Sequence, residues 1–209
     1  SAKTKDYATI LEINSETDFA AKDSQFLNFS EEVRNYIFNN KVIEISELND
    51  TKLEESRKTL VQTIGENIQL RRISTIEVDA SMKVGIYIHS DSKLGSIVVT
   101  EGGTDEVAKD IAMHVAAFNP ICLSQDKIAN DVLNRERAIF ENQAKESGKP
   151  KEIMGKIVDG KIKRFLSEVS LLSQNFVKDP EITIQEYLER ESANIISFSR
   201  LKVGEGIEV

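Results

Sequence analysis

Apolar residues recur at two different spacings along the first third of the chain, and these spacings predict strands and helices in turn. Residues 7–13 form a short β-rich run. Ser24 can cap a following helix, whose apolar stripe consists of Phe26, Phe29, Val33 and Ile37. A more polar helix over residues 47–64 ends at Gly65, and residues 68–78 then read as a long strand. This order predicts a small sheet with flanking helices.

The next stretch predicts a β-hairpin followed by a helix. Val84, Ile86 and Ile88 alternate with other residues, residues 90–93 supply turn chemistry, and an apolar run resumes over residues 94–100. A Gly-Gly-Thr sequence at residues 102–104, followed by two acids, is typical of a helix start, and this helix must end before Pro120.

Residues 126–169, approximately, predict two long helices that break at the sequence Ser-Gly-Lys-Pro of residues 147–150. The second helix carries one narrow apolar stripe, composed of Met154, Val158, Ile162, Phe165 and Val169. The other positions are mostly charged or polar. Such a pair should pack mainly on itself, which predicts an antiparallel coiled-coil hairpin that projects from the body.

A weak internal repeat suggests that the chain contains two related parts. Residues 68–75 align with residues 196–203, and in both runs the apolar phase shifts after an arginine, Arg72 or Arg200, as a β-bulge would require. We therefore expect an α+β fold of two related subdomains, 1–80 and 81–209. Each should have a small antiparallel sheet and flanking helices, with the coiled-coil hairpin inserted in the second.

Composition narrows the classes of function. The 209 residues are 40% hydrophobic, which suffices for a core, and the net charge of −8 disfavours a general nucleic-acid binder. No apolar run is long enough to span a membrane, and the single cysteine, Cys122, cannot form an internal disulfide. We expect a cytoplasmic protein of the bacterial type, and the sequence leaves an organellar version open. Because the chain begins at Ser1 without an initiator methionine or leader, we also expect an upstream domain to be missing.

A search for chemistry yields no candidate catalytic centre. His89, His114 and Cys122 show no triad spacing, and neither a metal-binding cluster nor a phosphate-binding loop is present in the sequence. Cys122 is most simply interpreted as a small buried hydrophobe. His114 shares a helical face with apolar neighbours, which favours a histidine at the edge of the core. We expect no cofactor and no metal, and the expected absence of enzymatic activity follows from the family resemblance described below.

The segment NSETDFAAKD, residues 14–23, places Phe19 among charged residues, and the pattern leaves two interpretations open. Phe19 lies seven residues before Phe26, so in an unbroken helix it would join the core stripe, and the pattern slightly favours this interpretation. A fresh cap at residues 22–24 would instead free the preceding turn, so that Phe19 could be an exposed anchor for a partner.

Six stretches together resemble the elongation factor Ts family, which exchanges the guanine nucleotide of elongation factor Tu. They are TDFAAKD (17–23), IGENIQLRR (64–72), IAMHVAAFNP (111–120), SGKPKEI (147–153), EVSLLSQNFV (168–177) and VGEGIE (203–208). The resemblance implies the two-subdomain core with its helical hairpin, and it implies that the N-terminal helical domain of the family is absent here. Ala20 stands where relatives more usually carry valine.

The resemblance also implies a partner and a set of contacts. Elongation factor Tu is the expected partner, with no direct nucleic-acid or membrane binding and a possible homo-association. The exchange contacts carry over to Asp18 and Phe19, to Leu94 and Gly95, and to His114, with Thr17 and Ala20 supporting the motif. By this resemblance Phe19 enters elongation factor Tu beside its magnesium and phosphate region. Gly95, without a side chain, would permit a close approach.

Three other functions compete with nucleotide exchange. An interaction scaffold could recruit a partner through the acidic surface and the hairpin without exchange activity. A small-molecule enzyme could use His114, Cys122 and an acid, although the sequence supports this only by possessing those residue types. Nucleic-acid binding would need a basic patch that the overall charge does not suggest.

Overall fold

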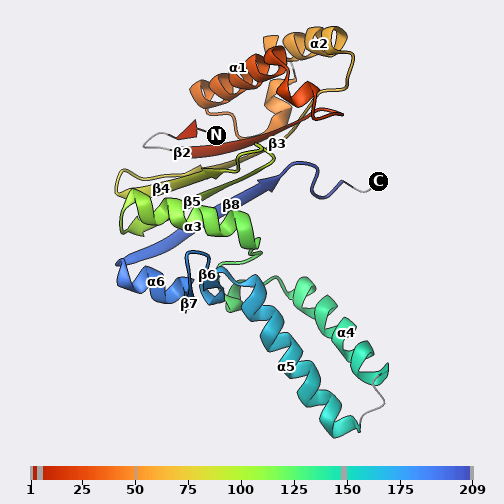
Figure 1. Cartoon of the computed structure of the whole chain (residues 1–209), viewed down its shortest axis with the longest axis vertical. Coiled ribbons are helices and arrows are strands. Elements are labelled where there is room, and N and C mark those ends of the chain that lie inside the picture. Colours follow the sequence, from red (N-terminus) through yellow and green to blue (C-terminus); the bar gives the residue numbers. More distant parts are fainter. Residues whose placement is uncertain (1, 4–6, 50, 147–149, 208–209) are drawn as a thin grey trace. The chain divides into compact units, whose positions relative to one another are not determined.

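The computed structural model describes residues 2–3, 7–49, 51–146 and 150–207, which belong to two compact units. The first unit comprises residues 1–116 and 195–209, and the second comprises residues 117–194. In chain order (Figure 1), the strands and longer helices are β1 (Ala2–Lys3), β2 (Tyr7–Asn14), α1 (Ser24–Asn40), α2 (Lys52–Ile64), β3 (Gln69–Glu77), β4 (Met82–Ile88), β5 (Leu94–Gly102), α3 (Asp105–Phe118), α4 (Asn130–Glu146), α5 (Lys151–Val169), β6 (Asn175–Phe176), β7 (Asp179–Thr183), α6 (Ile184–Arg190) and β8 (Ala193–Lys202). These helices and small sheets confirm the α+β class.

The first sheet has the order β1-β2-β3, with β2 antiparallel to both neighbours, and helices α1 and α2 cover one of its faces (Figure 1). The core between the helices and the sheet includes the whole predicted stripe of α1. Its buried members are Phe26, Phe29, Val33, Ile37, Val42, Leu48, Leu53, Leu60 and Ile68. The alternation of apolar residues in β2 and the helical spacing in α1 therefore meet in one core, as predicted.

The ends of these two helices differ in detail from the prediction. Asp23, and not Ser24, caps α1, because its carboxylate accepts the backbone N–H of Gln25 at 2.7 Å. The predicted helix over residues 47–64 is wrong in its first part. Residues 45–48 form a separate 3-10 turn, and Thr51 caps a new helix that begins at Lys52. The C-terminal end is confirmed, since Gly65 ends α2 with a φ of +79°.

The second sheet has the order β4-β5-β8, and it packs through apolar side chains on the face of the first sheet opposite α1 and α2. Ala8 and Ile10 of β2 contribute to this shared core, together with Val84, Ile97 and Val99. Helix α3 lies directly on β4. A Cβ at Gly85 would stand only 2.0 Å from the carbonyl oxygen of Ala108, so this glycine is required by the close approach of helix and strand.

A β-bulge interrupts the pairing of β2 with β3. Glu12 faces Arg72, but Ile13 faces Leu70, so Arg71 is the extra residue on β3. The phase shift of the apolar positions predicted a bulge next to Arg72, and the structure confirms this to within one residue. The bulge is the reason why two successive arginines, Arg71 and Arg72, turn toward the same neighbour on β2.

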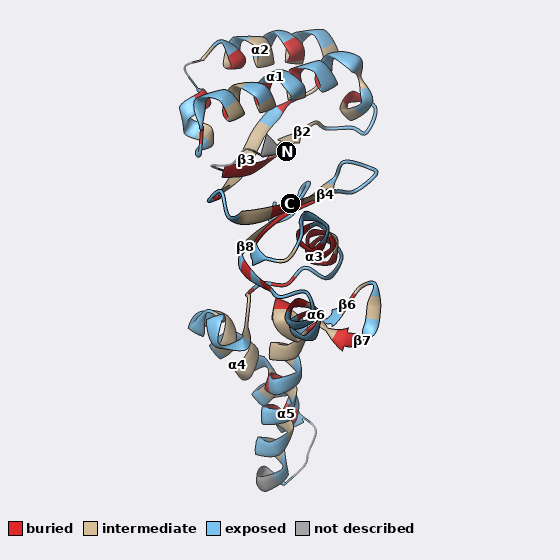
Figure 2. Ribbon diagram, turned by 90° about the vertical axis from the view of Figure 1, so that its left-hand side faces the viewer, coloured by how far each residue is buried: buried red, intermediate tan, exposed pale blue. Residues whose placement is uncertain are grey.

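In the second unit, α4 and α5 pack against each other through a small apolar cluster, and most of their surface is exposed or half-buried (Figure 2). The cluster contains Ala144, Val158 and Ile162, flanked by Leu133, Phe140, Met154 and Leu166. Phe165 contacts Phe140 edge to face, with ring centroids 6.4 Å apart. The predicted break at 147–150 lies mostly outside the described residues, because 147–149 are not described. The coiled-coil description of this hairpin stays a prediction.

The rest of the second unit consists of two short strands, helix α6 and the turns that connect them. Strands β6 and β7 form a two-stranded antiparallel sheet, and Thr183 caps α6 in a reciprocal arrangement with Glu186. Cys122 is buried, as predicted, and its sulfur lies 3.3 Å from the hydroxyl of Ser170. A subdomain boundary near residue 80 falls between β3 and β4, and it stays a prediction.

Candidate functional site

Phe19 is the most exposed large hydrophobic side chain of the described residues, with 89% of its surface accessible. The interpretation that the pattern slightly favoured, a core position in the stripe of α1, is wrong. Helix α1 begins at Ser24, and residues 20–22 form a separate 3-10 turn, so the helical register does not continue back to Phe19. An exposed aromatic ring is the feature that a docking anchor requires.

The backbone around Phe19 is held by a network of hydrogen bonds that centres on Thr17. Thr17 donates its N–H and its hydroxyl to the two carboxylate oxygens of Glu66, at 2.9 and 2.6 Å. The same hydroxyl accepts the N–H of Ala20 at 3.2 Å. Ala20 itself is buried. We call residues 17–20 the Phe19 turn. Its two ends are fixed while its central aromatic ring faces solvent.

Asp18 points to the hairpin that joins β4 and β5. Its carboxylate lies 2.6 Å from the ammonium group of Lys93, and both side chains are largely exposed. The hydrogen bond and the positive charge of Lys93 lower the pKa of Asp18, and the same contact raises the pKa of Lys93. Lys93 directly precedes Leu94, so this ion pair brings three of the predicted contact residues, Asp18, Phe19 and Leu94, into one surface region.

The other two predicted contacts lie inside the protein. Gly95 is buried, and a Cβ there would stand 2.6 Å from the side-chain termini of Ile10 and Ile88. Internal packing is sufficient to account for this glycine, and its expected role in a close approach of a partner stays a prediction. His114 is fully buried on α3 in this conformation, and its expected role as a partner contact stays a prediction. The pattern-based interpretation of His114 as a core residue is the correct one.

A buried carboxylate, Glu12, lies on β2, shortly before the Phe19 turn. Its side chain is only 1% exposed, and it forms ion pairs with Arg71, at 2.8 Å, and with Arg72. The backbone N–H of Gly204 donates a third hydrogen bond to it at 2.9 Å. Burial raises the pKa of Glu12, but the contacts with Arg71, Gly204 and Arg72 together outweigh burial and lower it.

This Glu12 cluster extends to the segment that follows β8. Arg71 donates to the carbonyl oxygen of Glu205 at 2.6 Å, and Arg72 donates to that of Lys202 at 2.9 Å. Arg200 in turn pairs with the carboxylate of Glu205 at 2.9 Å. The cluster therefore binds the end of β8 and the beginning of the VGEG motif, residues 202–205, to the first sheet.

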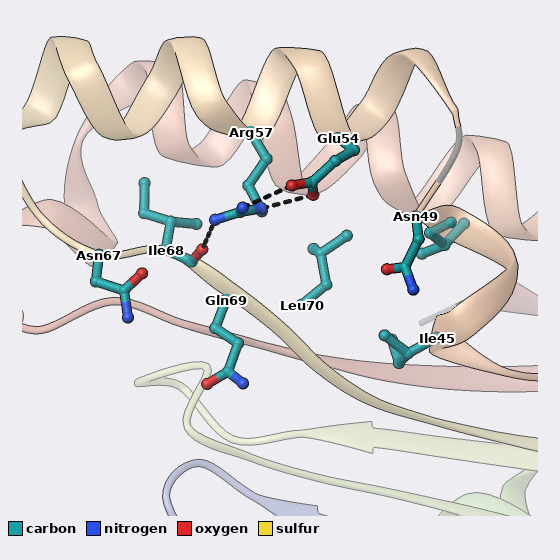
Figure 3. Close-up of a pocket in the computed structure, with 9 residues that line it drawn as sticks. Ile45, Asn49, Glu54, Arg57, Asn67, Ile68, Gln69 and Leu70 are labelled. Atoms are coloured by element: carbon teal, nitrogen blue, oxygen red, sulfur yellow. Dashed lines mark hydrogen bonds and ion pairs between the residues drawn. The ribbon is translucent and has the colours of Figure 1, made fainter.

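A hollow of about 330 Å³ opens beside α2 and the start of β3 (Figure 3). Its charged residues satisfy one another, since Arg57 binds both carboxylate oxygens of Glu54 at 2.7 Å and donates to the carbonyl oxygen of Ile68 at 2.7 Å.

The described parts of the chain contain no group of acidic, histidine or cysteine side chains that could hold a metal ion. Nor does any helix in those parts have the length and hydrophobicity to cross a bilayer.

Comparison with known proteins decides the family. The family model described as Elongation factor TS matches residues 16–205. This chain belongs to the elongation factor Ts family. Proteins named Elongation factor Ts are 46% identical to it in Hahella chejuensis, 45% in Teredinibacter turnerae and 48% in Francisella tularensis subsp. novicida. These matches cover 96–97% of this chain and 69–70% of each relative. Membership makes this chain a translation elongation factor.

The contacts that hold the elongation factor Ts motif were missed by reasoning from sequence. Glu66 and Lys93 are single charged residues next to turns, and the pattern gives no signal for either. Glu12, Arg71 and Arg72 did leave a signal, because charged residues inside strands that are otherwise apolar must find partners when they are buried. The IGEN motif contains Glu66, which binds Thr17, and the VGEG motif contains Gly204 and Glu205 of the Glu12 cluster.

Proposed function

We propose that this chain promotes the release of GDP from elongation factor Tu by inserting Phe19 beside the magnesium and phosphate region of that partner. The observation that carries the proposal is the 89% exposure of Phe19 on a turn whose two ends are fixed by hydrogen bonds. Asp18 precedes Phe19 in the chain and pairs with Lys93, the residue before Leu94, and Asp18 and Leu94 are the other direct contacts of the proposed docking surface.

Exchange of this kind needs no covalent chemistry. The factor must bind nucleotide-free elongation factor Tu more tightly than the GDP-bound form, and by linkage it then weakens GDP binding by the same factor. Burial of one phenylalanine is worth about 1.5–3 kcal/mol, which corresponds to roughly ten- to a hundredfold in affinity. The remaining effect must come from a wider interface.

Gly95 and His114 enter this proposal as supports and not as contacts. Gly95 lets β5 pack closely on Ile10 and Ile88, directly after Leu94. His114 lies in the buried face of α3, which packs on β4. In this proposal the α4–α5 hairpin forms a coiled coil that extends the surface available to a partner.

The test is stopped-flow release of fluorescent GDP from matched elongation factor Tu, with and without this protein. We expect the native chain to accelerate release and Phe19→Ala to slow the accelerated release by about tenfold or more. Ile43→Ala is the control, because it removes another apolar side chain of the first unit that is 61% exposed.

Two results would count against the proposal. If the native chain binds elongation factor Tu in a sedimentation assay but leaves GDP release unchanged, the protein is a scaffold without exchange activity. If release is accelerated equally by the native chain and by Phe19→Ala, exchange remains but Phe19 has no part in it.

A further inference from the structure

We propose that Glu66 is a positioning residue for nucleotide exchange, which acts only by holding the Phe19 turn in the geometry that docks. This inference rests on the proposed function of Phe19 and assigns a role to the acid of the IGEN motif. Glu66 itself need not touch the partner. Its contribution passes through Thr17 to the exposed ring two residues later.

The position of Glu66 in the fold makes it a firm anchor. It follows Gly65, whose positive φ ends α2 and whose N–H bonds to the carbonyl oxygen of Val61 at 2.9 Å, and β3 begins three residues later, at Gln69. A residue between a packed helix and a sheet strand has little freedom of its own. Its carboxylate can therefore hold a segment 49 residues away in sequence.

The two ends of the Phe19 turn are joined through one hydroxyl group. Thr17 gives its N–H to one oxygen of Glu66 and its hydroxyl proton to the other, which leaves the hydroxyl oxygen free to accept the N–H of Ala20. The carbonyl oxygen of Thr17 also accepts the N–H of Ala21 at 3.2 Å. Asp18 and Phe19 lie inside this closed set of bonds, so their backbone direction is fixed.

A ring that is 89% exposed gains little orientation from packing, and its direction therefore depends on its backbone. When only a fraction of molecules holds the docking geometry, the apparent affinity falls by that fraction. An anchored turn avoids the cost of ordering the segment at the moment of binding. Loss of Glu66 should release the turn and reduce exchange, although Phe19 is still present.

We call the two hydrogen bonds from Thr17 to Glu66 the clamp. Its chemistry predicts an order among variants of Glu66. A carboxylate accepts both protons of Thr17, whereas a carboxamide has one acceptor oxygen and keeps one of the two bonds. Alanine keeps neither. We expect exchange to fall in the order native, Glu66→Gln, Glu66→Ala, with Glu66→Gln about two- to tenfold slower than native, the range given by the loss of one net hydrogen bond, and Glu66→Ala slower still, up to the loss seen in Phe19→Ala.

The decisive experiment is a double-mutant cycle in the fluorescent-GDP release assay. If Glu66 acts only through the ring, the double variant Phe19→Ala/Glu66→Ala releases GDP at the same rate as Phe19→Ala alone. Additive losses would overturn the inference, because they would show a route that bypasses Phe19. Thermal unfolding of each variant, measured alongside, identifies any variant that has lost its fold.

The chain contains a closely matched control. Glu186 accepts the N–H and the hydroxyl of Thr183 at 2.7 and 3.0 Å, so a glutamate in the second unit likewise binds both donors of a threonine, although here both bonds go to one carboxylate oxygen, Oε2. Glu186→Ala removes these two bonds without touching the Phe19 turn. We expect it to leave the Phe19-dependent part of exchange unchanged, and an equal loss in both variants would overturn the assignment to Glu66.

A second measurement needs no partner. Chymotrypsin cleaves after exposed aromatic residues when the backbone is free to adapt, so cleavage after Phe19, followed by mass spectrometry, reports the mobility of the turn. We expect Glu66→Ala to increase this rate several-fold and Glu186→Ala to leave it unchanged. Faster cleavage without any exchange by the native chain would retain the clamp and reject the proposed function. Unchanged cleavage in Glu66→Ala would reject the clamp.

Discussion

Glu12 and Asp18 are two carboxylates only six residues apart, and each is paired with a cation, yet their surroundings differ. The side chain of Glu12 is 1% exposed and binds two arginines, whereas that of Asp18 is 69% exposed and binds one lysine. Both pKa values are lowered. The comparison teaches that similar pairing serves different ends, because the buried pair holds the two sheets and the VGEG segment together while the exposed pair stays accessible to a partner.

The largest effect should come from removing the buried partner. Glu12→Ala leaves Arg71 and Arg72, which are 17% and 33% exposed, without their shared counter-charge and leaves the N–H of Gly204 without this acceptor. Breaking a buried pair in this way costs about 3–5 kcal/mol, and the partial exposure of the arginines places this case at the lower end. Urea unfolding of native protein, Glu12→Ala and Asp18→Ala would measure it, and equal midpoints for the first two would contradict the role of the cluster.

A smaller loss of stability is expected when the pH is lowered. Because the pKa of Glu12 is lower in the folded protein than its ordinary value of 4.5, its contribution to stability is complete above that value. The contribution is then lost as pH falls through the lower, folded pKa. The free energy of unfolding should therefore decline more steeply below pH 4.5 in native protein than in Glu12→Gln, as followed by urea unfolding at successive pH values. Parallel declines would show that Glu12 is not among the groups responsible.

The smallest effect on stability should come from the exposed pair. Lys93→Ala should leave the urea midpoint within experimental error of the native value, because exposed ion pairs are screened by water and salt. Adding 1 M salt should likewise abolish any difference between native protein and Lys93→Ala but retain most of the difference between native protein and Glu12→Ala. A loss of stability in Lys93→Ala comparable to that in Glu12→Ala would remove the distinction between the two carboxylates.

Much of this fold could be predicted because periodicity and local chemistry agree. The stripe from Phe26 to Ile37, the αL end at Gly65 and the hairpin between β4 and β5 all follow from the identities of neighbouring residues. The helix that was predicted from residue 47 failed because the chain has two N-caps here. Glu44 begins a 3-10 turn and Thr51, seven residues later, begins α2, and the sequence alone does not rank the two.

The candidate site was predictable only in part. Phe19 lies in helical register with Phe26, so the periodicity predicted a buried ring. The resemblance to elongation factor Ts was needed to predict an exposed one. The burial of His114 was visible in its apolar neighbours. The bonds from Thr17 to Glu66 and from Asp18 to Lys93 join residues 49 and 75 positions apart, and contacts of that separation are set by the tertiary fold and not by local pattern.

The bond between Gly204 and Glu12 joins residues 192 positions apart, and it has a consequence for synthesis on the ribosome. The first unit is discontinuous, since β8 completes its second sheet after the whole second unit has been made. The second unit is one continuous stretch and can assemble as soon as it emerges. A nascent chain halted before β8 would therefore carry a folded hairpin and an incomplete first unit. The cluster of Glu12, Arg71 and Arg72 would lack the N–H of Gly204, which is synthesised after all three.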